Sequence, residues 1–125
     1  MNRINAIKEL VLANMNGFSV GFTSLKPLDN DKGKYCIALT DNSKKDLTKS
    51  IKSVVSASMV FKQISRKLVL GGWYDKDSDR YCLDLVIQEE SIEMAMFIAK
   101  TFNQKAIFNL ETFEEIKNED YKDEN

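Results

Sequence analysis

The sequence contains no histidine, and this removes the most common general base, proton shuttle and transition-metal ligand of proteins. A Ser–His or Cys–His nucleophile cannot be assembled, so an enzyme would have to rely on carboxylates and lysine. Cysteine is also scarce, because Cys36 and Cys82 are too few for a disulfide framework or a structural zinc site. The composition therefore predicts a protein that is not an enzyme and has no cofactor or metal site.

Long apolar runs and an excess of charge of one sign are absent too. No run approaches the ~20 apolar residues of a membrane-spanning helix, and the charged N-terminal stretch lacks the apolar core of a signal peptide. The 18 basic and 19 acidic residues leave a net charge of −1, which disfavours a strongly polyanion-binding protein. We expect a cytoplasmic protein without membrane contact, and the length of 125 residues is that of a single-domain protein.

A short pattern occurs twice, and both cysteines lie in it. The segment Tyr35-Cys36-Ile37-Ala38-Leu39 resembles Tyr81-Cys82-Leu83-Asp84-Leu85, and a basic residue precedes each copy. Alternating apolar residues are typical of half-buried strands. The pattern predicts two equivalent strands, each the return strand of a hairpin that leads into a helix. If they lie side by side, Cys36 and Cys82 could face each other as ordinary packed residues.

Apolar periodicity and turn residues predict the remaining elements. Helices are expected over residues 2–15, 43–64 and 92–102, hairpins over 18–40 and 67–88, and a last strand over 105–110. Ser91 is the expected N-cap of the third helix, and Asn103-Gln104 its end. The order αββαββαβ predicts an α+β fold with one antiparallel sheet of about five strands, with a possible duplication of the hairpin–helix unit. We expect a domain over residues 1–116 and an acidic tail over 117–125.

Two short motifs in the second hairpin invite a ligand-binding interpretation. Gly71-Gly72 precedes no helix and lacks a following Lys-Ser or Lys-Thr, so it predicts a bulge or bend instead of a phosphate loop. Asp75-x-Asp77-x-Asp79 matches the start of a calcium loop, but Arg80 follows where that loop requires glycine. A solvated hairpin turn is the favoured interpretation.

The aromatic residues beside this turn are the best candidates for a binding surface. Trp73 and Tyr74 are adjacent, so they point to opposite faces of a strand and cannot both be core residues. Together with Asp77 and Arg80 they form the predicted protein-binding site, since aromatic residues and arginine dominate protein interfaces. Cross-strand aromatic pairing within the sheet is the alternative explanation.

A second candidate surface is the basic face of the central helix. Lys45, Lys49 and Lys52 share one side of it, as residues three or four positions apart do. They could contact the phosphates of a nucleic acid, which would make binding strongly salt-dependent. An ordinary solvated helix face explains the same pattern.

The second half of the chain has a recognisable order of motifs. The Trp73-Tyr74-Asp75 hairpin is followed by a helix that passes through Asn103-Gln104 into an Ala106-Ile107-Phe108 strand and an acidic close. Over residues 71–116 this resembles small uncharacterised proteins of bacteriophages and other mobile elements. The resemblance implies a phage accessory protein in a bacterial cytoplasm. With the exposed aromatic hairpin, we expect it to bind a host or phage protein, for example as an inhibitor of a host defence or processing enzyme. The alternative is a nucleic-acid-binding module.

Overall fold

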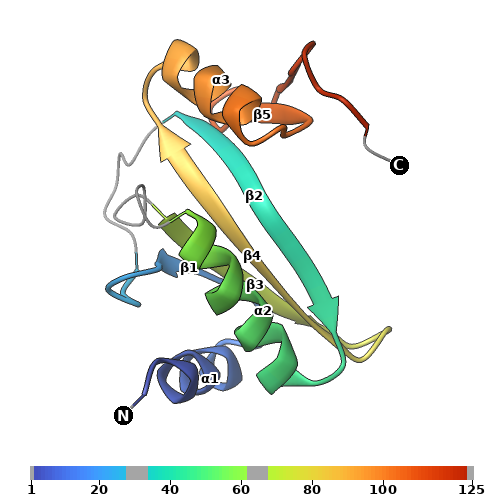
Figure 1. The fold of residues 1–125 in the computed structure, drawn as a ribbon. Coiled ribbons are helices and arrows are strands. Elements are labelled where there is room, and N and C mark those ends of the chain that lie inside the picture. Colours follow the sequence, from blue (N-terminus) through green and yellow to red (C-terminus); the bar gives the residue numbers. More distant parts are fainter. Residues whose placement is uncertain (1, 28–33, 62–67, 124–125) are drawn as a thin grey trace. The chain divides into compact units, whose positions relative to one another are not determined.

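The protein has an α+β fold with one antiparallel sheet (Figure 1). The computed structural model describes residues 2–27, 34–61 and 68–123. Its elements are α1 (Arg3–Ala13), β1 (Phe18–Gly21), β2 (Tyr35–Lys44), α2 (Leu47–Val60), β3 (Leu68–Asp75), β4 (Arg80–Glu89), α3 (Ile92–Thr101), β5 (Ala106–Asn109) and β6 (Glu115–Lys117). The predicted fold class and the single antiparallel sheet are confirmed. The short strand β6 follows the predicted elements.

The strand order is β1-β3-β4-β2-β5-β6, so the predicted hairpin over residues 18–40 does not form. β1 pairs with β3, and Val20 lies opposite Leu70 in an apolar cross-strand pair. The other edge of β1 is covered by the chain that follows it, because the Gly21 amide donates to the Lys26 carbonyl at 3.0 Å and Pro27 bridges Val20. β2 does not pair with β1 and lies between β4 and β5.

The contacts group the chain into two compact units where the sequence predicts a single domain. Unit 1 comprises Met1–Leu28 and Thr40–Leu85, and unit 2 comprises Asp29–Leu39 and Val86–Asn125. The long strands β2 and β4 contribute residues to both. Fully buried side chains in unit 1 include Ile7, Val11, Ile51, Val54, Leu70 and Leu85, and those in unit 2 include Ile37, Ile87, Ala95, Ala99 and Ile107.

The helices begin at polar caps. The α3 cap is as predicted, since Ser91 accepts a hydrogen bond from the Met94 amide at 3.2 Å. α3 ends at Thr101, and Asn103, two residues later, has a φ of 51° that turns the chain away from the helix. α2 begins later than residue 43 because β2 extends to Lys44, and Asp46 caps the helix by accepting from the Lys49 amide. The predicted end of this helix at residue 64 lies outside the described residues. Within the described ranges, no helix is long and apolar enough to cross a membrane.

Gly71 and Gly72 lie in a regular stretch of β3, so the predicted bulge is wrong. Both pair one-to-one with β1, and neither has a positive φ. Their role is to leave space on both faces of the strand. A Cβ on Gly72 would lie 2.5 Å from Leu83 Cδ2 and 2.7 Å from Phe18 Cζ, whereas a Cβ on Gly71 would lie 2.5 Å from Asp84 Oδ1.

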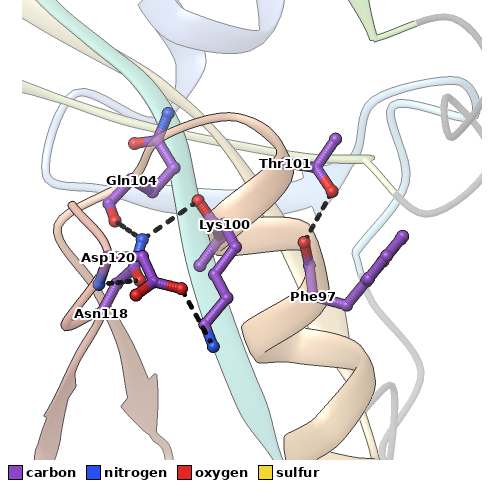
Figure 2. Close-up of polar contacts among 7 residues, drawn as sticks. Phe97, Lys100, Thr101, Gln104, Asn118 and Asp120 are labelled. Atoms are coloured by element: carbon purple, nitrogen blue, oxygen red, sulfur yellow. Dashed lines mark hydrogen bonds and ion pairs between the residues drawn. The ribbon is translucent and has the colours of Figure 1, made fainter. Parts of the chain in front are cut away.

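The segment after residue 116 is held by side-chain contacts of unit 2, although the sequence predicts a tail from residue 117. Asn118 is buried, and its Nδ2 donates to the Gln104 carbonyl at 2.8 Å and lies 3.5 Å from the Ala99 carbonyl. Its Oδ1 accepts from the Asp120 amide (Figure 2). The Asn118 amide donates to the Lys105 carbonyl. Asn118 thus ties the chain after β6 to the end of α3.

Substituting Asn118 tests whether this segment is part of the folded unit. Asn118→Ala should lower the free energy of unfolding by about 1–3 kcal/mol, because it leaves buried carbonyls unsatisfied. Urea unfolding of the full chain measures this, with the exposed neighbour substituted in Glu119→Ala as the matched control. Equal stability of the two variants would show that the segment after β6 is an unattached tail.

Candidate functional site

Trp73 lies on the face of the sheet opposite to the buried side chain of Leu83. Gly72 faces Leu83 and Gly71 faces Asp84. Since successive residues of a strand point to opposite faces, Trp73 shares its face with Gly71 and Asp84. Its side chain is 49% exposed, which is high for the largest apolar side chain.

Trp73 borders a pocket of about 420 Å³ that lies entirely within unit 1. The residues that line this Trp73 pocket are Asn42, Ser43, Trp73, Cys82, Leu83 and Asp84. They come from three neighbouring strands, β2, β4 and β3, of which β4 is the middle one. The pocket therefore presents an indole ring together with a hydroxyl, a thiol and a carboxylate.

The pocket is bounded by contacts between β4 and its neighbours. The Cys82 Sγ lies 3.7 Å from Ser43 Oγ. Arg80, two residues before Cys82, donates from Nη1 to the Ser43 carbonyl at 2.8 Å. At the other end, the Asp84 carboxylate lies over Gly71. The positive group of Arg80 thus lies at one end of the pocket along β4, and the negative group of Asp84 lies in its lining.

A buried polar contact joins α2 to β2 and β4, two of the strands that line the pocket. Ser50 is fully buried, and its Oγ lies 2.6 Å from Asn42 Oδ1 and 3.2 Å from the Tyr81 carbonyl. A hydroxyl has one proton and donates to one of these oxygens at a time. The Asn42 Nδ2 is buried and has no hydrogen-bond partner among the described residues. The small side chain of Ser50 lets α2 approach the sheet closely.

Tyr74 points to the opposite face from Trp73, as the alternation predicts. Its ring lies 4.9 Å from that of Tyr81, centroid to centroid, and its hydroxyl donates to Asp79. This hydrogen bond to a carboxylate, the largest of several effects, raises the pKa of Tyr74. Tyr74 therefore takes part in the cross-strand aromatic pairing that the sequence left as an alternative, and Trp73 does not share this contact.

Asp77 lies in the turn between β3 and β4 and is exposed. Its amide donates to Asp75 Oδ1 at 3.1 Å, and Ser78 donates to Asp75 Oδ2 at 2.9 Å. Asp79 accepts from Tyr74. The carboxylates of Asp75 and Asp79 thus stabilise the turn itself. Among the described residues, no cluster of three or more carboxylate or thiol side chains could hold a metal ion.

The three lysines of the alternative site lie at the start of α2 and are exposed. Lys49 and Lys52 are on the helix, whereas Lys45 precedes the Asp46 cap. The structure therefore does not place all three on one helical face. None of them lines the Trp73 pocket.

The two cysteines have different neighbours, so they do not face each other. Cys36 pairs with Phe108 of β5, whereas Cys82 contacts Ser43. Neither cysteine forms a disulfide. The strands that contain them are neighbours in the sheet, but antiparallel pairing puts the second residue of one strand near the end of the other.

The sequence predicted one of the pocket residues, Trp73, and placed Arg80 beside it. It missed Ser43 and Asp84 as site residues, because Ser43 was assigned to the start of a helix. Asp84 offered one clue. A carboxylate between the apolar residues Leu83 and Leu85 must point to the other face of the strand.

Comparison with protein-family models, curated proteins and solved structures finds no match to this chain. The likeness to phage proteins stays an expectation from the sequence. The geometry of the Trp73 pocket is therefore the basis for a functional proposal.

The Tyr74–Asp79 hydrogen bond predicts a specific effect of pH. A pKa raised in the folded state means a stabilising contribution that is present below the ordinary tyrosine pKa of about 10 and is lost as pH rises through the higher folded value. Asp79→Asn, which tolerates the left-handed backbone at φ 55°, should lower the pKa of Tyr74. Titration of the Tyr74 ring carbon by NMR measures this. Asp77→Asn is the control, and an equal effect of both variants would contradict a direct bond.

Proposed function

We propose that this protein is a non-enzymatic binding protein that contacts another protein through the face around the Trp73 pocket. The observation that carries the proposal is the half-exposed indole of Trp73 at a pocket whose lining combines apolar and polar side chains. Tryptophan is the residue type most enriched at the energetic centres of protein interfaces. About half of the Trp73 surface stays exposed in the fold, and in this proposal the partner covers it.

The contacts around the pocket support a surface that is formed before the partner arrives. Arg80 is bonded to the Ser43 carbonyl, and Tyr74 holds the hairpin from the other face through Tyr81 and Asp79. A preformed surface loses less conformational entropy on binding than a flexible one. Of the four residues predicted as the site, Trp73 is the contact residue in this proposal. Tyr74 and Arg80 position the hairpin, and Asp77 lies at its exposed turn.

The resemblance to proteins of phages and mobile elements supports a host or phage protein as the partner. Inhibition of a host defence or processing enzyme is one form that such binding would take. Nucleic-acid binding through Lys45, Lys49 and Lys52 is the alternative. It has weaker support, because these lysines do not form a single helical face and lie apart from the aromatic pocket.

Substitution of Trp73 tests the proposal. Trp73→Ala should weaken capture of the partner by roughly 30-fold or more, the loss that is usual for a central interface residue. Affinity purification from the native host identifies the partner, and titration with that purified protein gives the affinity. The matched control is Phe113→Ala, which removes an exposed aromatic residue (74% exposed) from unit 2.

A variant with all three lysines changed to glutamate separates the two functions. It should bind the partner as well as the unsubstituted protein does. Unchanged partner affinity in folded Trp73→Ala would overturn the proposal. Salt-sensitive binding of DNA that only the lysine variant loses would favour the alternative.

A further inference from the structure

We infer that the Trp73 pocket receives an arginine side chain of the partner protein, held between the Trp73 indole and the Asp84 carboxylate. This inference rests on the proposed function and specifies the chemistry of the group that is bound. The pocket has about 420 Å³, within the usual range of roughly 300–1,000 Å³ for sites that hold a small group. It is therefore large enough for one side chain.

Asp84 places a carboxylate on the same face of the sheet as Trp73. Its carboxylate lies over residue 71, where any Cβ would approach Oδ1 to 2.5 Å. Residue 71 lies two positions before Trp73 on the same face of β3, a separation of about 7 Å along a strand. Glycine at position 71 thus allows the Asp84 carboxylate to lie over β3, on the same face as Trp73 and in the lining of the same pocket. A carboxylate accepts several hydrogen bonds at once, so it can bind a ligand group in addition to its contacts within the fold.

The Trp73 indole also favours a positively charged ligand group. Cations bind over aromatic faces, and tryptophan is the best of the aromatic residues for this interaction. A guanidinium group is planar, stacks on such a ring, and binds a carboxylate through two parallel hydrogen bonds. An ammonium group offers a point charge without this planar match. The pair of Trp73 and Asp84 therefore favours arginine over lysine.

The other groups at the pocket fit this orientation. Arg80, which is bonded to the Ser43 carbonyl, lies toward the end of β4 away from Asp84. Its charge disfavours a cation at that end and directs one toward Asp84. The Ser43 hydroxyl and the Cys82 thiol, 3.7 Å apart, line the wall between these two ends.

The test uses two capped peptides, acetyl-Gly-Arg-Gly-amide and the same peptide with neutral citrulline in place of arginine. Trp73 is the single tryptophan of the chain, so intrinsic fluorescence reports on the pocket directly. At low salt, the arginine peptide should change the fluorescence saturably in the millimolar range and shift the amide signals of Ser43, Cys82 and Asp84. The citrulline peptide should bind at least about 5-fold more weakly, the loss expected for one partly exposed charge pair.

Two variants test whether the Asp84 carboxylate causes the preference for the arginine peptide over the citrulline peptide. Asp84→Asn keeps the shape of the side chain and should bring the two peptides to within about 2-fold of each other. Gly71→Ala should have a similar effect without touching the peptide, because its Cβ displaces the carboxylate. Glu119→Gln, which neutralises an exposed carboxylate of unit 2, is the control and should retain the preference.

Equal binding of the two peptides, no saturable change up to about 20 mM, or an undiminished preference in Asp84→Asn would each overturn the inference. These results are independent of the partner test. Loss of partner binding in Trp73→Ala without an arginine preference leaves the proposed function in place and removes only the arginine. An arginine preference together with unchanged partner binding in Trp73→Ala would remove the proposed function and leave only the binding of an arginine group at the pocket.

Discussion

The absence of side chains at positions 71 and 72 is the constraint on which unit 1 and its pocket depend. On one face of β3, Gly72 leaves room for Leu83 and Phe18, which would otherwise collide with a Cβ. On the other face, Gly71 leaves room for the Asp84 carboxylate. The same two residues thus allow close packing of the core and bring a charged group beside Trp73. A larger residue at position 72 would push Leu83 and Phe18 out of their packed positions, and one at position 71 would displace the Asp84 carboxylate.

The hairpin that follows uses its polar residues mainly for its own structure. The turn carboxylates accept hydrogen bonds from neighbouring groups of the turn and from Tyr74. Tyr74 and Tyr81 pair on one face. Because these groups are occupied within the hairpin, Trp73 is the residue of this segment that remains as a large, half-exposed apolar group. In the function that we propose, a protein partner covers this residue, since tryptophan is enriched among the residues that dominate protein interfaces.

Much of the fold could be predicted from the sequence, because its local patterns are strong. The Ser91 cap, the stop at Asn103, the second hairpin and the α+β class all follow from periodicity and turn chemistry. The pairing of β1 with β3 could not, since strand partners far apart in the chain depend on tertiary packing that no local pattern encodes. The predicted bulge was wrong for a related reason. A glycine pair in a strand fits both a bulge and close side-chain packing, and only the neighbours across the strand decide between them.

The candidate site was predicted in part for the same reasons. The alternation of side chains along a strand separated Trp73 from Tyr74. Ser43 and Asp84 could be assigned to the same site as Trp73 only once the strand order β3-β4-β2 was known.

The Trp73 pocket is tested most directly by a nuclear Overhauser measurement of the contacts of the Trp73 ring. The structure predicts contacts from the Trp73 ring protons to the Cys82 methylene group, and from the Tyr74 ring to the Tyr81 ring. Contacts of the Trp73 ring with the rings of Phe18 or Tyr81 would place the tryptophan on the opposite face and contradict it.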